Sequence, residues 1–260
     1  MRARWLAALG LALVPATPAA AERLFTLWKL EPTVAAPPSR AVWGEPFLEQ
    51  RLLPVKLVRL TDPVMAGDQV IVAGGSFLFL VYNAAGKTGY CTVKDRSMKN
   101  QARTLFIPIL DRRPCLTDRD GDGRFDASFT VFDKYGSAAT PSGSLDGATA
   151  LAKPVAYQAA DPHLFPVAMK IAFELGGKKV PEKVQVRVKM DKAGRGKWEY
   201  WDAILPRAGR TIGALNAEVE VKSVTGREAA IDVRLDPGIY IRGESGGRFV
   251  AGPLPSFLNE

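Results

Sequence analysis

Alternation of apolar and polar side chains with a period of two residues most limits the fold of this chain. The segment 184–190, Val-Gln-Val-Arg-Val-Lys-Met, alternates without interruption. The same period recurs at Val219 and Val221 and again over 231–235. A period of two with β-branched residues indicates strands that bury one face, as antiparallel sheets do. No segment of about a dozen residues carries the apolar stripe of an amphipathic helix.

Further strands are expected where apolar residues gather between turn residues. The run 77–82 is continuously apolar and predicts a strand buried on both faces, although a short buried helix fits the same pattern. The loop 191–197 contains an aspartate and two glycines, which predict a hairpin between 184–190 and 198–205. Other expected strands cover 24–30, 55–60, 69–73, 104–110, 127–133, 168–175, 238–242 and 248–252. The sequence therefore predicts an all-β, or nearly all-β, antiparallel sandwich or barrel.

The N-terminus resembles a secretory signal. A basic start at 1–4 is followed by an apolar run over 5–14 and by small residues at 19–21. This order is typical of a cleaved signal peptide over residues 1–21, cut near Ala21-Glu22. The apolar run is shorter than the roughly 20 residues that span a bilayer, and no later segment reaches that length. We therefore expect a periplasmic or secreted protein that does not span the membrane.

Composition also suggests how the mature chain is divided. Between 137 and 153 it shifts to Ser, Ala, Gly, Thr and Pro, which indicates a linker or a long surface loop. We therefore expect an N-terminal β domain over 22–136, which holds both cysteines, and a C-terminal β domain over 154–260. A single sandwich with one long connection is the alternative.

Cys91 and Cys115 are the only cysteines. In an oxidising compartment an isolated pair is usually joined, so we predict a disulfide between them. For a ring of this size the chain-entropy treatment gives a stabilisation of about 3–4 kcal/mol. Two buried free thiols are the alternative. A metal site is less favoured because the chain has a single histidine and no third cysteine.

An acidic loop is the most specific local motif. Residues 118–126 read Asp-Arg-Asp-Gly-Asp-Gly-Arg-Phe-Asp, with acids at alternate positions and glycine at the sixth. Calcium requires several oxygen ligands around one point, and glycine permits the turn that gathers them. The expected ligands are the carboxylates of Asp118, Asp120 and Asp122, the backbone carbonyl of Arg124, and Asp126 directly or through water.

These residues resemble the calcium loops of dockerin modules and of thrombospondin calcium repeats, which share the acid–glycine spacing. The resemblance covers about a dozen residues and implies a weakly bound, structural calcium ion. The twelfth position normally carries a bidentate acid but is Phe129 here, and Asp133 would need a different loop path to replace it. The alternative is an Asp/Gly turn that binds nothing. Four carboxylates in nine residues repel one another, and a cation or nearby arginines would relieve that repulsion.

The segment Gly243-Glu244-Ser245-Gly246-Gly247 fits the nucleophile pattern Gly-x-Ser-x-Gly and is similar to the serine segment of chymotrypsin-like proteases. A nucleophilic serine requires a base, and the single histidine is His163. Because His163 precedes Ser245, the order of an α/β-hydrolase is excluded, and its surroundings differ from the histidine segment of chymotrypsin-like proteases. A glycine-rich turn explains the residues, so a serine hydrolase is the least favoured function.

A cluster of basic and aromatic residues extends from 178 to 201, beginning at Lys178 and Lys179. Cations beside aromatic rings bind sugars, phosphates or polyanionic surfaces, and the alternative is a solvated strand face paired with acids on a neighbouring strand. The candidate ligand-binding residues are Arg187, Lys189, Lys192, Arg195, Lys197, Trp198 and Trp201.

Together these features favour a non-enzymatic, exported β protein, a binding or structural module of the cell envelope that calcium stabilises. A polyanion- or glycan-binding adhesion module is the alternative. The expected partner is an anionic envelope polymer or another envelope protein. Removal of Arg2 and Arg4 lowers the net charge from +8 to +6. An excess this small does not indicate nucleic-acid binding, and an exported protein rarely meets nucleic acid.

Overall fold

The chain is built almost entirely of antiparallel strands. The computed structural model describes residues 23–33, 36–93, 111–133, 142–180, 183–191, 198–205, 211–244 and 248–258. Over these residues it contains nineteen strands and two short 3-10 turns, which confirms the all-β prediction. Neither turn is long or apolar enough to cross a membrane, and the described residues form no other helix.

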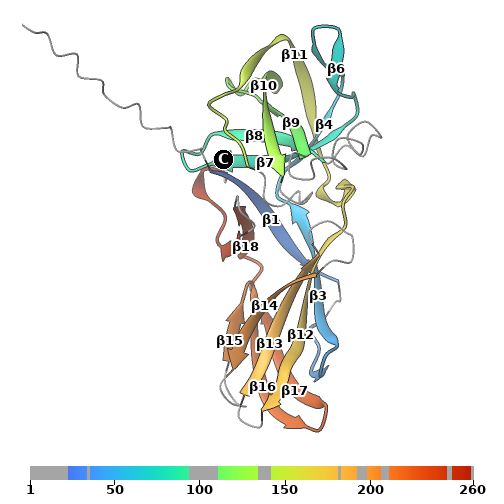
Figure 1. Cartoon of the computed structure of the whole chain (residues 1–260), viewed down its shortest axis with the longest axis vertical. Coiled ribbons are helices and arrows are strands. Elements are labelled where there is room, and N and C mark those ends of the chain that lie inside the picture. Colours follow the sequence, from blue (N-terminus) through green and yellow to red (C-terminus); the bar gives the residue numbers. More distant parts are fainter. Residues whose placement is uncertain are drawn as a thin grey trace, which may run out of the picture.

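Six strands close into a barrel in the upper half of Figure 1. Their order is β7, β4, β11, β10, β9 and β8, and the pairing of β7 with β8 closes the ring. The hairpin of β5 (Val64–Ala66) and β6 (Gln69–Val72) is inserted between β4 and β7. The ring strands are β4 (Leu57–Leu60), β7 (Phe77–Asn83), β8 (Thr88–Thr92), β9 (Asp111–Thr117), β10 (Arg124–Asp133) and β11 (Thr149–Ala160).

The barrel has its own core. Buried side chains from β4, β7, β9, β10 and β11 contact one another, and Tyr90 of β8 packs against them. Every strand of the ring therefore contributes to this cluster. Alternate residues of β7, including Phe79 and Val81, belong to a second core, which continues into the sandwich. The prediction that 77–82 is a strand buried on both faces is therefore confirmed.

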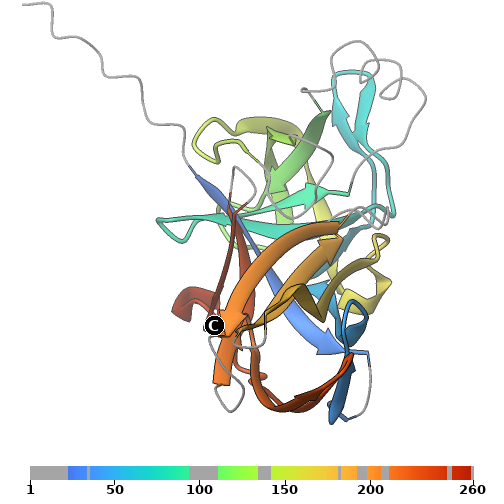
Figure 2. The same cartoon turned by 60° about the horizontal axis from the view of Figure 1, so that its bottom comes forward.

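Two facing sheets form a sandwich below the barrel (Figures 1 and 2). One layer runs β14, β13, β12, β3 and β1, and the other runs β15, β16, β17 and β2. Phe173 and Val188 of the first layer share a buried core with Val219 and Ile231 of the second. The strands are β2 (Arg40–Val42), β3 (Pro46–Pro54), β12 (Met169–Val180), β13 (Lys183–Asp191), β14 (Trp198–Leu205), β15 (Thr211–Ala214), β16 (Ala217–Thr225) and β17 (Glu228–Leu235).

Strand β1 (Leu24–Pro32) belongs to both the barrel and the sandwich. Residues 24–26 pair with β7 of the barrel, and residues 28–32 pair with β3 of the sandwich. On its other edge β1 pairs with β18 (Tyr240–Glu244), which in turn pairs with β19 (Arg248–Gly252). The chain passes from the barrel to the sandwich a second time through η1 (Pro162–Leu164), between β11 and β12.

Strand pairing crosses the expected domain boundary. Strand β11 begins inside the expected 137–153 linker and is a full barrel strand. Strands β1 and β3 of the 22–136 segment pair with β18 and β12 of the 154–260 segment. The two segments are therefore not independent sheets. Strand β11 escaped prediction because it exposes many of its residues, so its alanine-rich sequence lacks an apolar alternation.

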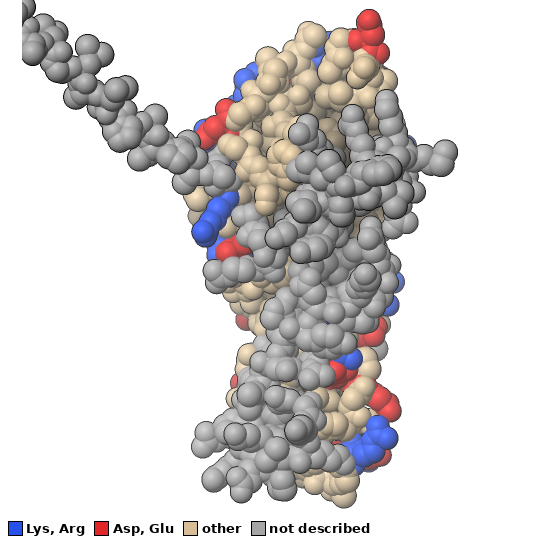
Figure 3. Space-filling view, viewed as in Figure 1, with Lys and Arg blue, Asp and Glu red and all other residues tan. Residues whose placement is uncertain are grey.

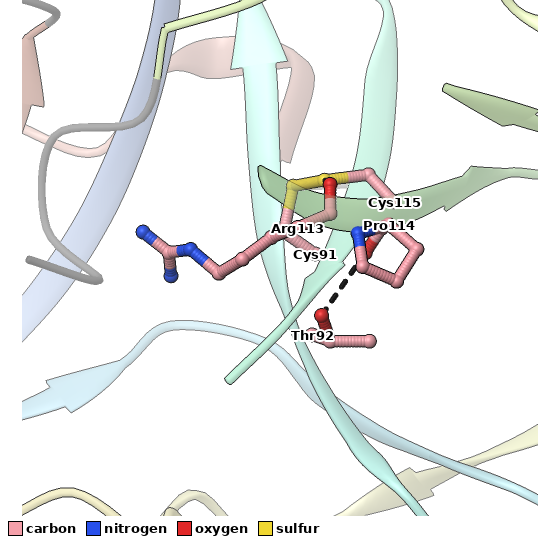
Figure 4. Close-up of a disulfide and its surroundings, with 5 residues drawn as sticks. All are labelled: Cys91, Thr92, Arg113, Pro114 and Cys115. Atoms are coloured by element: carbon pink, nitrogen blue, oxygen red, sulfur yellow. Dashed lines mark hydrogen bonds between the residues drawn. A yellow bond between two sulfur atoms is a disulfide. The ribbon is translucent and has the colours of Figure 1, made fainter. Parts of the chain in front are cut away.

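The predicted disulfide is confirmed. Cys91 of β8 and Cys115 of β9 lie directly opposite each other, with Cα atoms 4.1 Å apart, and both are fully buried. Beside the bridge, the Thr92 hydroxyl donates a hydrogen bond to the Pro114 carbonyl at 3.1 Å (Figure 4). The bridge therefore joins two neighbouring barrel strands. The expected strand at 104–110 lies outside the described residues.

A pair of buried amides connects the two layers of the sandwich. Nε2 of Gln50 donates to Oδ1 of Asn216 at 2.8 Å, and Nδ2 of Asn216 donates to Oε1 of Gln50 at 2.9 Å. Gln50 is 0% and Asn216 is 5% exposed. Asn216 reaches this position from the β15–β16 turn, where Leu215 adopts a φ of 57°. Each side-chain amide is the hydrogen-bond partner of the other, at a buried position that water does not reach.

We expect Asn216→Leu to lower the free energy of unfolding by about 1–3 kcal/mol, because the Gln50 amide would then be buried without its partner. The double variant Gln50→Leu, Asn216→Leu removes both polar groups and should recover part of this loss. Urea unfolding of the single variant, the double variant and the wild type measures the difference. A double variant that is no more stable than the single one would contradict this account.

Candidate cation site at the β9–β10 loop

The acidic loop connects two barrel strands next to the disulfide. Strand β9 ends at Thr117 and β10 begins at Arg124, so residues 118–123 form the connection. Asp118 follows Cys115 by three residues. The disulfide therefore holds the entrance of the loop, and the β9–β10 ladder holds both of its ends.

The structure brings three of the predicted ligands together. Asp118, Asp120 and Asp122 each place a carboxylate oxygen within 4.8 Å of the other two. Asp118 is half-buried, whereas Asp120 and Asp122 are exposed. Three carboxylates this close repel one another, and a cation between them would turn the repulsion into attraction.

Backbone N–H groups already support these carboxylates. Asp118 accepts hydrogen bonds from the amides of Gly121 at 2.7 Å and Gly123 at 2.9 Å. The two glycines have φ values of 76° and 83°, a conformation that favours glycine. Asp122 also accepts a hydrogen bond, from the amide of Arg124 at 2.8 Å. Backbone hydrogen bonds therefore curl the loop around its own acids.

Tyr157 is the site residue that sequence reasoning missed. Its hydroxyl donates to Oδ2 of Asp118 at 2.9 Å, and its amide donates to the Gly123 carbonyl at 3.4 Å. The tyrosine ring stacks on Phe125 with centroids 4.2 Å apart. Nothing in the sequence points to Tyr157, because only the pairing of β10 with β11 brings it to the loop.

Electrostatics at Asp118 favour its ionised form. Burial raises the pKa of this carboxyl, but hydrogen bonds from Tyr157, Gly123 and Gly121 outweigh burial and lower the pKa below its ordinary value of 3.8. The pKa of Tyr157 is raised, first by burial and then by its hydrogen bond to Asp118. The pair is therefore a neutral donor and a charged acceptor at neutral pH.

The remaining predicted ligands are arranged differently. Asp126 accepts hydrogen bonds from the Arg119 side chain at 2.8 Å and from the Arg119 amide at 3.2 Å, and it is not among the three converging acids. The guanidinium of Arg124 donates to the Pro154 carbonyl at 3.2 Å. Phe129, at the twelfth position of the loop, is buried in the core. The loop itself therefore offers no bidentate acid at its closing position.

The basic and aromatic cluster is only partly described. Lys189 forms an ion pair with the buried carboxylate of Glu174, which leaves 17% of the lysine side chain exposed. Arg187 lies opposite Glu174 on β12 and Asp202 on β14 in the strand register. Trp198 and Trp201 lie on β14, and Lys192, Arg195 and Lys197 fall outside the described residues. The described surface visible in Figure 3 mixes both charge signs without a broad basic patch.

The hydrolase hypothesis depends on two residues, of which the structure describes one. Ser245 lies outside the described residues. His163 lies in η1, with Nε2 3.6 Å from a carboxylate oxygen of Glu31. Both side chains of this pair are well exposed, which is typical of a surface ion pair.

Comparison with protein-family models, with curated proteins and with solved structures finds no match to this chain.

We expect Tyr157→Phe to lower the free energy of unfolding by about 1–2 kcal/mol at neutral pH, because Asp118 loses a hydrogen bond to its charged form. The pKa of Asp118 is lower in the folded protein than its ordinary value of 3.8, so its ionised form stabilises the fold. This stabilisation is complete at a pH well above 3.8, and it disappears as the pH falls through the folded-state pKa of Asp118. The difference between variant and wild type should therefore shrink in acid. Denaturant unfolding over a pH series measures it.

Tyr90→Phe is the matched control. Tyr90 packs against Phe125 and Tyr157, and in the described structure its hydroxyl makes no hydrogen bond to Asp118. A loss in Tyr157→Phe that persists unchanged to low pH would show that the hydroxyl acts through packing and not through the Asp118 carboxylate.

Proposed function

We propose that this chain is an exported, non-enzymatic module of the cell envelope whose barrel is stabilised at one end by calcium. The observation that carries the proposal is the convergence of Asp118, Asp120 and Asp122 on one point beside a buried cross-strand disulfide. A disulfide between buried cysteines is typical of oxidising compartments, and this agrees with the signal expected over residues 1–21.

The donor set suits calcium. Calcium takes six to eight oxygen ligands in a flexible arrangement, and carboxylates, backbone carbonyls and water all serve. The three acids of the loop supply carboxylate oxygens, and the carbonyl of Arg124 is the expected fourth ligand. Water would complete the sphere, because Phe129 stands where a bidentate acid would close it. Fewer protein ligands mean weaker binding, so we place the affinity near the ~10⁻⁴–10⁻³ M of extracellular modules.

A structural role follows from the position of the site. The loop joins β9 to β10 and lies three residues from the disulfide, so an ion there would hold the end of β9, the strand that the sulfur bridge joins to β8. Tyr157 extends this link to β11 through its hydrogen bond to Asp118. We infer that the module presents a stable β scaffold to an anionic envelope polymer or to another envelope protein.

Calcium should raise the melting temperature of the wild-type protein. At ten times the dissociation constant, binding to the folded state adds about 1.4 kcal/mol, which corresponds to a shift of about 3–5 °C for a chain of this size. Asp120→Asn and Asp122→Asn should each abolish most of the shift, since each removes one of the converging carboxylates. Differential scanning calorimetry with and without calcium measures this.

Asp68→Asn is the matched control, because it makes the same charge change at an exposed position on the β5–β6 hairpin, outside the loop. It should retain the full calcium shift. Magnesium should produce a smaller shift, because it requires a more rigid octahedral site. The absence of any heat or melting shift with the wild type at millimolar calcium would end the proposal of a calcium site.

A further inference from the structure

The segment that follows β19 folds back over the sheet. Residues 253–258, here called the strap, end in the turn η2 (Ser256–Leu258) and lie against the start of β1 and against β7 (Figure 1). Leu258 is 7% exposed and contacts a cluster that contains Leu27 and Leu80. The ring of Phe257 lies 5.3 Å from the ring of Tyr82, centroid to centroid. Two side chains therefore anchor the strap.

The surface beneath the strap extends across three neighbouring strands, β18, β1 and β7. The guanidinium of Arg242 lies 5.1 Å from the centre of the Phe25 ring, and Phe25 lies 5.4 Å from Tyr82. The Phe257 ring of the strap continues this row beyond Tyr82. We call the surface the strap-binding face, and it comprises Phe25, Leu27, Leu80, Tyr82, Tyr240 and Arg242.

Side chains alone hold the strap in place. Over the described residues, the one hydrogen bond of the strap is internal, from the amide of Leu258 to the carbonyl of Pro255 at 3.0 Å. Pro253 and Pro255 have no N–H to donate to a strand. The strap therefore differs from β18 and β19, which are held by a backbone ladder, and it can leave without breaking a sheet hydrogen bond.

Polar groups beneath the strap are incompletely paired while it is closed. Nη2 of Arg242 donates to Oε1 of Glu244 at 2.8 Å, but Nε of Arg242 is buried and makes no hydrogen bond within the described part of the chain. The buried Tyr82 hydroxyl lies beside this guanidinium. Tyr82 is 4% exposed, and burial raises the pKa of its hydroxyl, an effect that the nearby Arg242 opposes. Closure keeps both donors away from water, and opening would hydrate them. This arrangement favours a strap that releases.

We propose that the strap opens while the sheet stays folded, and that the strap-binding face then binds the strap of a second copy of this chain. The face already fits this sequence, with Phe257 and Leu258 as its anchors. The strap joins β19 at Gly252, the last residue of the β18–β19 ladder, so the chain can swing away at Pro253 while that ladder stays paired. The short connection gives the strap of the same chain a high effective concentration, so exchange requires a weakened strap or a high protein concentration.

A full-length Phe257→Ala, Leu258→Ala variant tests the proposal, with a fluorescent peptide of residues 252–260 as the probe. The variant keeps the sheet but weakens its own strap. Fluorescence anisotropy should show saturable binding to the variant at least tenfold tighter than to the wild type, whose own strap competes. Leu164→Ala, which truncates an exposed leucine of η1, should behave like the wild type. A peptide with alanine at both anchor positions should not bind.

Equal binding of the peptide to the variant and to the wild type would overturn the proposal, as would no binding to a variant whose circular dichroism is native. If the double variant does not fold, hydrogen exchange of the wild type decides the matter. The amide of Leu258 should then exchange at least a hundredfold faster than the buried amide of Ile241 in β18. Equal protection would show that strap and sheet open together, and the proposal would fail.

Discussion

Strand β1 is the constraint on which the rest of the structure depends. It pairs with a barrel strand over 24–26 and with a sandwich strand over 28–32. One extended segment therefore sets the position of the barrel relative to the sandwich. Trp28 lies at the crossing, fully buried, with its ring 5.6 Å from Phe79 and 5.5 Å from Phe165. These contacts join β1, a barrel strand and the connection from β11 to β12. A change that displaced Trp28 would therefore disturb the packing between the barrel and the sandwich.

Two parts of the barrel surface are held by different chemistry. In one part, sulfur joins β8 to β9 covalently, and a loop curled around Asp118 continues from β9 into β10. Tyr157 ties that loop to β11, so four adjacent strands share one network of bonds. Near β1, apolar contacts dominate, and the strap lies on a row of rings without a backbone ladder. The first part is therefore held by covalent and hydrogen bonds, whereas the strap is held by side-chain packing alone.

Local sequence patterns predicted much of the fold and part of the site. The alternation over 184–190 became β13, the apolar run at 77–82 became β7, and the acid–glycine spacing placed Asp118, Asp120 and Asp122 together. Each of these depends on residues a few positions apart. Strand β11 was missed because it exposes many of its residues, and Tyr157 was missed because it reaches the loop through strand pairing. The ion pair of Lys189 with Glu174 was likewise invisible, because the two residues lie on different strands.

By itself, the sequence determined the strand periodicity, the turn chemistry of the acidic loop and the presence of one cysteine pair. Only the tertiary structure decided that six strands close into a ring, that β1 pairs with both the barrel and the sandwich, and that Gln50 contacts Asn216 across the sandwich. The physical reason is that backbone ladders form between almost any two extended segments. The choice of partner is made by the packing of side chains distant in the chain, which no local pattern records.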